Sequence, residues 1–258
     1  MESLVLYKVE DRIAEITINR PEKRNALNPT LVSDLTAAFL FAQSDVNVKV
    51  VILKANGDVF SAGADLAYMQ QLQNFSYNEN IQDSTALKDL FETIRTLQKV
   101  VIAQVEGHAI AGGCGLATIC DIVFAVPEAK FGYTEVKLGF VPAIVSCYLI
   151  QKVGETLAKK LLLSGDLFTA AEALTYNLIT SVTKSDEINQ TVREFALNLT
   201  NNTSGNSLAL TKQLINQTSN TWLDSCLSNA IEVNAKTRES DDFKKGISSF
   251  LAKEKINW

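Results

Sequence analysis

Two patterns of hydrophobic residues alternate along the first half of the chain. Short runs of successive apolar and β-branched residues are typical of buried strands. Such runs predict strands at 12–19, 48–53, 100–105 and 122–126. After the first run, Asn28-Pro29 indicates an N-cap followed by proline at the first helical position, and apolar residues at helical spacing then predict an amphipathic helix over 29–43. Alternating strands and helices of this kind predict an α/β fold.

From about Gly154 onward the pattern is helical. Apolar residues recur at helical intervals in several successive segments. These segments predict helices at 154–164, 169–176, 185–200, 206–219, 222–238 and 241–253. Only residues 179–183 have the character of a strand there. We therefore predict an α/β core over residues 1–183, which carries the active site, and a helical region over 184–258 that makes oligomer contacts within the same overall domain.

Composition and charge narrow the class of protein. Hydrophobic residues make up 47% and charged residues 21%, as in soluble globular proteins. The net charge is −5 and no run of Lys or Arg occurs, so we expect no nucleic-acid partner. Residues 1–4 lack the features of a signal peptide, and the longest uncharged apolar run, 138–150, is well short of the ~20 residues that span a bilayer. We therefore expect a cytoplasmic protein with no membrane partner.

The cysteines and the single histidine limit the available chemistry. Cys114, Cys120, Cys147 and Cys226 show no metal or disulfide spacing and have apolar neighbours, so we expect free, mostly buried thiols. His108 is the only histidine, which excludes His-rich metal sites, and we expect it to pack at a strand end. No metal site is predicted. Carboxylates and backbone amides remain as the groups that carry chemistry.

The first informative segment, 60–66, follows the predicted strand at 48–53. Its small residues, Ser61-Ala62-Gly63-Ala64, allow a ligand to approach the main chain closely. Asp65 is placed to begin a helix that runs toward Met69, where its charge suits the positive end of the helix. Taken alone, the segment is better explained as an ordinary strand-to-helix turn.

The second segment, 107–116, follows the predicted strand at 100–105. Gly112, Gly113 and Gly115 stand at a helix start, where each glycine costs about 1 kcal/mol relative to alanine. Either tight helix packing or a bare amide edge that faces a ligand would require them. A helix N-terminus favours anionic oxygen. A phosphate loop is the competing interpretation, but no Gly-Lys-Ser/Thr follows.

The third segment, 131–142, contains a carboxylate among apolar residues. Glu135 is flanked by Val136 and Leu138, with Phe140 close by. An apolar environment raises the pKa of a carboxyl group, which then serves as a general acid or base near neutral pH. From these residues alone, however, the simpler interpretation that Glu135 only caps a short helix is favoured.

The three segments, in this order and at these spacings, resemble the enoyl-CoA hydratase/isomerase (crotonase) family. The similarity begins at 19–27 and ends with 243–255. It implies a crotonase-like spiral of ββα units with a helical C-terminal region, assembled as a homotrimer or a dimer of trimers. It also implies an acyl-CoA thioester substrate whose carbonyl oxygen is held by the backbone N–H groups of Ala64 and Gly112.

The resemblance also implies which residues bind the substrate. No separate cofactor is expected, because coenzyme A is part of the substrate. Glu135 corresponds to a catalytic glutamate of the family. The substrate-binding positions implied are Lys23, Arg24, Ala26, Leu27, Ala62, Asp65, Leu66, Gly113, Tyr133, Phe250 and Lys253.

One departure from the family pattern bears on the reaction. Hydratases with two catalytic glutamates carry the first one twenty residues before the second, and position 115 is glycine here. A single carboxylate that removes and returns a proton suits a Δ3-Δ2 enoyl-CoA isomerase. Residues 133–146 and 112–116, however, resemble a bacterial subgroup assigned to methylglutaconyl-CoA hydration. We therefore expect a hydratase of a short, branched or carboxylated enoyl-CoA such as 3-methylglutaconyl-CoA, with an isomerase or a non-catalytic acyl-CoA- or RNA-binding member as alternatives.

Overall fold

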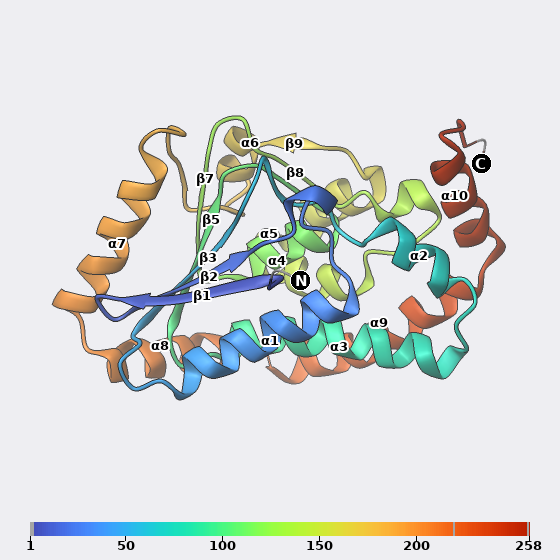
Figure 1. Ribbon diagram of the computed structural model, residues 1–258. Helices are drawn as coiled ribbons and strands as arrows, with labels where there is room; N and C mark the ends of the chain where they lie inside the picture. Colours follow the sequence, from blue (N-terminus) through green and yellow to red (C-terminus); the bar gives the residue numbers. More distant parts are fainter. Residues whose placement is uncertain (1–2, 219, 257) are drawn as a thin grey trace.

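A computed structural model describes residues 3–218, 220–256 and 258 (Figure 1). The larger of its two sheets has six strands in the order β1-β2-β3-β5-β7-β10. These strands are β1 (Val5–Glu10), β2 (Ile13–Ile18), β3 (Val50–Ala55), β5 (Val100–Val105), β7 (Ile122–Ala125) and β10 (Ser181–Val182). β1 and β2 form an antiparallel hairpin, and all other pairs in this sheet are parallel.

The second sheet consists of four short strands in the order β4-β6-β8-β9. They are β4 (Val59–Ser61), β6 (His108–Ile110), β8 (Lys130–Gly132) and β9 (Phe168–Thr169). Three times in succession, a strand of the large sheet is followed by a strand of the small sheet and then by a helix: β3-β4-α2, β5-β6-α4 and β7-β8-η2. The predicted spiral of ββα units is thereby confirmed.

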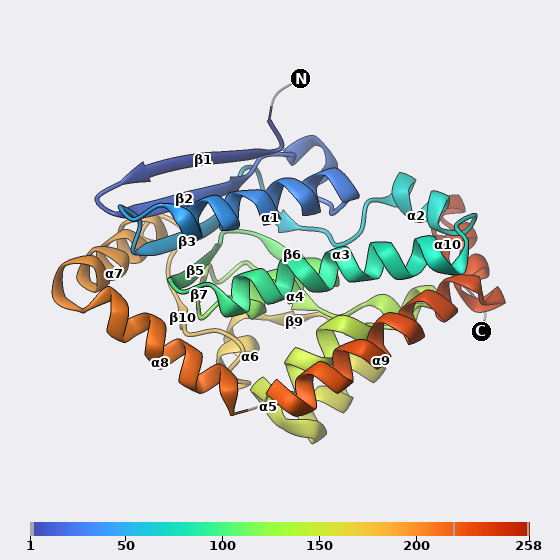
Figure 2. The ribbon, with the colours of Figure 1, turned by 90° about the horizontal axis from the view of Figure 1, so that it is seen from below.

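Ten α-helices and two short 3₁₀ helices lie within the described ranges. They are η1 (Pro21–Lys23), α1 (Pro29–Ser44), α2 (Leu66–Leu72), α3 (Tyr77–Thr96), α4 (Gly112–Ile119), η2 (Glu135–Leu138), α5 (Ala143–Ser164), α6 (Ala170–Thr175), α7 (Ile188–Asn202), α8 (Gly205–Gln217), α9 (Asn220–Glu239) and α10 (Asp241–Ala252). Seen from below, α3 lies between α1 and α9, and α9 packs on α5 (Figure 2). One large apolar core fills the space between the six-stranded sheet and these helices.

The structure agrees with most of the predicted elements. Strand β1, helix α3 and the four short strands of the second sheet have no counterpart in the sequence prediction. Helix α5 runs from Ala143 to Ser164 and is interrupted at Gly154, which has φ 75°. Its second half matches the predicted helix at 154–164, and its first half was not predicted. His108 begins β6, and its Nδ1 accepts a hydrogen bond from the Lys130 N–H at 3.2 Å, so it has a packing role near the surface.

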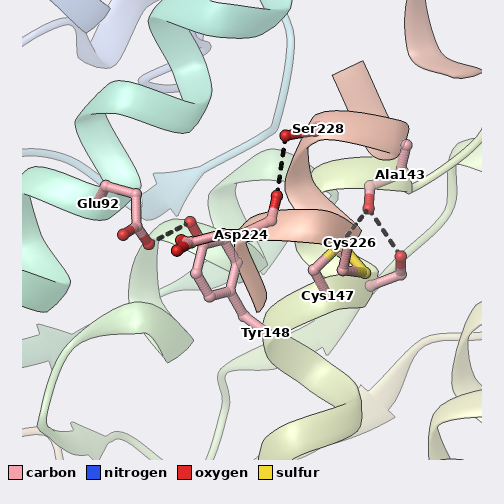
Figure 3. Close-up of a disulfide and its surroundings, with 8 residues drawn as sticks. Glu92, Ala143, Cys147, Tyr148, Asp224, Cys226 and Ser228 are labelled. Atoms are coloured by element: carbon pink, nitrogen blue, oxygen red, sulfur yellow. Dashed lines mark hydrogen bonds between the residues drawn. A yellow bond between two sulfur atoms is a disulfide. The ribbon is translucent and has the colours of Figure 1, made fainter. Parts of the chain in front are cut away.

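The prediction that all four cysteines are free is wrong for two of them. Cys147 of α5 and Cys226 of α9 form a disulfide, with their Cα atoms 6.0 Å apart (Figure 3). They are separated by 79 positions, so no spacing motif announces the pair. Cys114 and Cys120 are free and buried. Burial raises the pKa of the Cys114 thiol to about 12, which leaves it unreactive at neutral pH.

Two kinds of feature are absent from the described residues: a membrane-spanning helix and a cluster of metal-binding side chains. No helix among them is long and apolar enough to cross a bilayer. No three or more His, Cys, Asp or Glu side chains among residues 3–218, 220–256 and 258 are grouped so that they could hold a metal ion.

Candidate active site

The three informative segments meet because they follow adjacent strands of the small sheet. β4, β6 and β8 are parallel neighbours, so their carboxyl ends lie at the same edge. The loop after β4 carries Ala62–Asp65, the turn after β6 leads into Gly112, and the turn after β8 leads into Glu135. All three border a cavity of ≈1720 Å³.

The cavity runs between the core and the C-terminal helices. Its walls are mainly apolar and come from α1, α2, α3, η2, α9 and α10. Most of the predicted site residues line it. They are Lys23, Arg24, Ala26, Leu27, Ala62, Ala64, Asp65, Leu66, Gly112, Glu135 and Phe250.

Three predicted substrate-binding residues lie outside the cavity walls. Tyr133 is only 1% exposed, and its hydroxyl lies 3.2 Å from the Thr118 Oγ1. Gly113 packs against the backbone of Ser61, where an added Cβ would lie 2.5 Å from the carbonyl oxygen. Lys253 is the left-handed C-cap of α10. Within a single chain, a substrate that fills the cavity therefore does not meet these residues.

The main chain holds the Ala64 amide free of internal hydrogen bonds. Leu27 forms a parallel bridge with Ala64: its N–H donates to the Gly63 carbonyl at 2.7 Å, and its carbonyl accepts from the Asp65 N–H at 2.8 Å. In a parallel bridge, the N–H of the middle residue points away from the partner strand. The Ala64 N–H is therefore not used by Leu27.

The Gly112 amide is free for a different reason. It is the first residue of α4, and the first four N–H groups of a helix have no partner within it. The turn before it is fixed because the Ala111 N–H donates to the Gly132 carbonyl at 2.7 Å. A Cβ added to Gly63 would lie 3.0 Å from the Ala111 Cβ, so the two loops are in close contact. Within the described chain, neither the Ala64 nor the Gly112 N–H has a hydrogen-bond partner.

An ion pair holds the first loop in place. Arg20 lies 2.6 Å from the Asp65 carboxylate and also donates to the Ala26 carbonyl at 2.9 Å. The Asp65 carboxylate caps α2 by accepting from the Ala67 and Tyr68 N–H groups. Hydrogen bonds from Arg20 and from these two amides lower the pKa of Asp65, although burial opposes the shift. Asp65 therefore caps the start of α2, as predicted, and its ion pair with Arg20 holds the loop in place.

Glu135 is a buried carboxyl group with an unsatisfied oxygen. Glu135 is the first residue of η2, lies at the cavity wall and is only 7% exposed. Its Oε2 has no hydrogen-bond partner among the described residues. Burial raises the pKa of Glu135 to about 7. Both protonation states are therefore accessible near neutral pH, as a general acid–base group requires.

Packing explains the glycine at position 115. A Cβ there would lie 2.4 Å from Cγ1 of Val145 and 2.9 Å from Cε2 of Phe91. The space that a glutamate side chain would need is filled by these apolar groups. Tight packing thus accounts for Gly113 and Gly115, whereas Gly112 stands at the cavity and meets only Leu27 at 3.3 Å.

The sequence prediction missed a second set of cavity residues. Tyr68, Asp83, Asn234 and Arg238 line the part of the cavity between α2, α3 and α9. They are contributed by three helices far apart in sequence, and no local motif connects them. The buried position of Arg238 and its carboxylate partner Asp83 become apparent only in three dimensions.

Two free backbone amides and a buried, unpaired carboxyl group on one apolar cavity define an enzyme site of the oxyanion-hole class. Comparison with known proteins names the family. The enoyl-CoA hydratase/isomerase family model matches residues 8–258. The chain belongs to this family.

Relatives and solved structures cover the whole chain. A crotonyl-CoA hydratase of Syntrophomonas wolfei is 34% identical over 100% of this chain and 98% of the relative. A 2,3-dehydroadipyl-CoA hydratase of Escherichia coli is 32% identical over 98% of this chain and 97% of the relative. The crystal structure of an enoyl-CoA hydratase from Mycobacterium avium has a TM-score of 0.88 at 32% identity and covers 100% of both chains.

Proposed function

We propose that this chain is an enoyl-CoA hydratase that adds water across the 2,3-double bond of a short, branched or carboxylated acyl-CoA such as 3-methylglutaconyl-CoA. The observation that carries the proposal is the meeting of three groups at one cavity: the free amides of Ala64 and Gly112 and the unpaired carboxyl of Glu135. The names of the relatives, which include hydratases of crotonyl-CoA and of 2,3-dehydroadipyl-CoA, support hydration.

The two amides bind the thioester oxygen in this mechanism. Attack of water at C3 of the enoyl group moves the electron pair of the double bond toward the carbonyl, so that an enolate oxygen forms. The N–H groups of Ala64 and Gly112 are fixed before the reaction and stabilise this charge as it develops. Each such donor contributes about 3–4 kcal/mol in well-studied oxyanion holes.

Glu135 moves the proton. As a carboxylate it accepts a proton from water while the water oxygen bonds to C3. The protonated carboxyl then gives a proton to C2 of the enolate, so that water is added in full and Glu135 is regenerated. Its raised pKa suits both halves of the cycle. Lys23 and Arg24, exposed at the cavity rim, supply positive charge for the phosphates of coenzyme A.

One observation favours isomerisation as a second candidate. The position of the other family glutamate is filled by Val145 and Phe91, so Glu135 acts without a second carboxylate there. A Δ3-Δ2 isomerase needs one group that removes a proton from C2 and returns it to C4, and a single glutamate suffices for this.

Spectrophotometry of the conjugated thioester separates the two reactions. The purified protein is given crotonyl-CoA, 3-methylglutaconyl-CoA and a 3-enoyl-CoA. Loss of absorbance with either of the first two substrates supports hydration, and a rise with the 3-enoyl substrate alone would replace the proposal by isomerisation. Glu135→Gln must abolish the signal. Glu92→Gln is the matched control, because Glu92 is also partly buried but lies outside the cavity walls.

We further infer a homotrimer or a dimer of trimers, with contacts from the C-terminal helices. Leu210, Leu214 and Ile215 leave an exposed apolar patch on α8, which supports a subunit contact there. Light scattering measures the mass directly.

We also propose a cytoplasmic location, but the Cys147–Cys226 disulfide is at odds with it, since disulfides are rare in reducing compartments. Fractionation of cells shows whether the protein lies in the cytoplasm or in an oxidising compartment.

A further inference from the structure

The cavity contains a second site with unsatisfied polar atoms. Four buried side-chain nitrogen or oxygen atoms in the described chain have no hydrogen-bond partner, and three of them belong to cavity-lining residues. One is Oε2 of Glu135. The other two, Oδ1 of Asn234 and Nε of Arg238, belong to residues one turn apart on α9. A buried polar atom without a hydrogen-bond partner destabilises the protein, so a ligand that pairs with these two atoms would be bound favourably.

The Arg238 side chain is held firmly by its other nitrogens. Its Nη2 lies 2.6 Å from a carboxylate oxygen of Asp83, and its Nη1 donates to Oδ1 of Asn80 at 3.2 Å. The Tyr68 hydroxyl donates to the same Asp83 carboxylate at 2.5 Å. Arg238 is only 5% exposed. The guanidinium is therefore fixed with its Nε–H unused.

The Asn234 amide is held on one side only. Its Nδ2 donates to the Ser84 hydroxyl at 3.1 Å, and the residue is only 4% exposed. A serine hydroxyl both donates and accepts hydrogen bonds. The amide therefore satisfies Ser84 in either orientation and leaves its remaining group, carbonyl or NH₂, without a hydrogen-bond partner.

Phe140 connects this second site with the catalytic turn. Its ring centroid lies 5.6 Å from the Arg238 guanidinium, and its N–H donates to the carbonyl of Glu135 at 3.1 Å. Phe140, Leu138 and Val141 line the same cavity, so an apolar stretch lies beside Glu135. An acyl chain whose thioester oxygen is bound by the Ala64 and Gly112 amides would extend along these apolar residues toward Arg238.

We propose that Arg238 and Asn234 bind an oxygen function at the far end of the acyl group. The oxygen accepts the Arg238 Nε–H, and the Asn234 amide pairs with the rest of the group: its carbonyl with a hydroxyl, or its NH₂ with a carboxylate. This proposal rests on the proposed function in so far as the cavity holds an acyl-CoA. It makes Arg238 and Asn234 determinants of specificity, separate from the chemistry at Glu135.

Binding of saturated thioesters tests the proposal without turnover. Pentanoyl-CoA, 5-hydroxypentanoyl-CoA and glutaryl-CoA have the same chain length and differ only at the end group. Isothermal titration calorimetry with the full-length protein should show that at least one oxygenated thioester binds about tenfold more tightly than pentanoyl-CoA, as a charge-assisted hydrogen bond predicts. The tighter of the two identifies the end group. Equal binding of all three, or tightest binding of pentanoyl-CoA, would overturn the proposal.

Two variants locate the contact. Arg238→Lys keeps a positive charge for Asp83 but has no Nε, and Asn234→Leu removes the amide. In each variant, the ratio of the pentanoyl-CoA Kd to the Kd of the preferred oxygenated thioester should fall toward one. Arg95→Lys is the control, because Arg95 is another buried arginine with a carboxylate partner, Glu92, and lies outside the cavity walls. A ratio unchanged in both Arg238→Lys and Asn234→Leu would overturn the proposal.

The outcome is separable from that of the proposed function. Hydration is judged by turnover of crotonyl-CoA, and the end-group preference by binding of thioesters that have no double bond to hydrate. A preference without turnover would remove the hydratase proposal and leave this one standing. Turnover without a preference would do the reverse.

Discussion

The two ends of the cavity are built in different ways. At the oxyanion end, Ala64, Gly112 and Glu135 each follow a short strand of one parallel sheet, so local chain direction brings them together. The other end, which contains Asp83, Asn234 and Arg238, is called the acyl end because we propose that the end of the acyl group binds there. Asp83 and Arg238 come from helices packed against each other and are more than half the chain apart in sequence. The first end depends on backbone geometry, and the second depends on side chains that packing places.

On the two proposals above, this difference separates the reaction from its specificity. The Ala64 and Gly112 amides belong to the backbone, so the oxyanion end depends on only one side chain, that of Glu135. Side chains of α3 and α9 change one at a time and alter the shape and polarity of the acyl end. A substitution at one end should therefore leave the other end unchanged.

Glu135→Gln should lower the rate of the reaction at the oxyanion end and leave binding at the acyl end unchanged. Removal of a general acid–base group lowers kcat by about 10²–10⁴-fold. The end-group preference measured with saturated thioesters should persist, because Arg238 and Asn234 are untouched. Steady-state kinetics and calorimetry on the same preparation make the comparison. Retention of more than a tenth of wild-type kcat would show that another group moves the proton.

Loss of the disulfide should loosen the acyl end. Cys147–Cys226 ties α9, which carries Asn234 and Arg238, to α5 across 79 positions of sequence. Removal of a disulfide that closes a long loop typically lowers the free energy of unfolding by about 2–4 kcal/mol. Cys226→Ser should show this loss in denaturant unfolding.

A reducing agent provides the control for that measurement. It should lower the unfolding midpoint of the wild-type protein to that of Cys226→Ser and have no effect on the variant. Equal midpoints for oxidised and reduced wild-type protein would contradict a stabilising role for the disulfide.

Glu135→Gln should also stabilise the fold above neutral pH. The folded-state pKa is about 7 and the ordinary value is 4.5, so the folded protein binds the proton more tightly than the unfolded chain does. Stability is therefore lost as pH rises from about 4.5 through about 7, by up to about 3 kcal/mol. Glutamine does not titrate, so the variant should gain on the wild type over this window.

Denaturant unfolding at pH 5 and pH 8 measures this effect. The difference in unfolding free energy between Glu135→Gln and wild type should be larger at pH 8. A constant difference would mean that Glu135 has an ordinary pKa, and the case for it as an acid–base group would weaken. The oxyanion end would then lack the buried carboxyl group of raised pKa that distinguishes it from the acyl end.

The sequence predicts the two ends to different extents. The segments around Ala64, Gly112 and Glu135 are recognisable because each is a continuous motif after a strand. Helix α3 was not predicted, because Asn80, Ser84 and Arg95 are buried and interrupt the apolar periodicity. Two of these residues face α9: Asn80 contacts Arg238, and Ser84 contacts Asn234. The polar residues of α3 that contact α9 at the acyl end therefore interrupt the apolar pattern from which the helix would be predicted.

Other elements escape prediction for simpler reasons. The strands of the small sheet have two or three residues each, too few to show a period. The glycines at 113 and 115 look alike in the sequence, and only their neighbours show that both serve packing. Nothing local to Cys147 or Cys226 indicates a pairing across such a separation.

Gly115→Ala tests the packing of α4, the helix that begins at Gly112, and should have the smallest effect. The added methyl would meet Val145 and Phe91, and overpacking of this kind typically costs about 1–3 kcal/mol of unfolding free energy. Val145→Ala should restore part of the loss in the double variant, because it removes the Cγ1 that lies 2.4 Å away. Gly205→Ala is the control: it begins α8, and a Cβ there meets only Lys49 at 3.7 Å. If Gly115→Ala were as stable as Gly205→Ala, space for a side chain would exist at position 115, and the absence of a glutamate there would need a chemical explanation in place of a steric one.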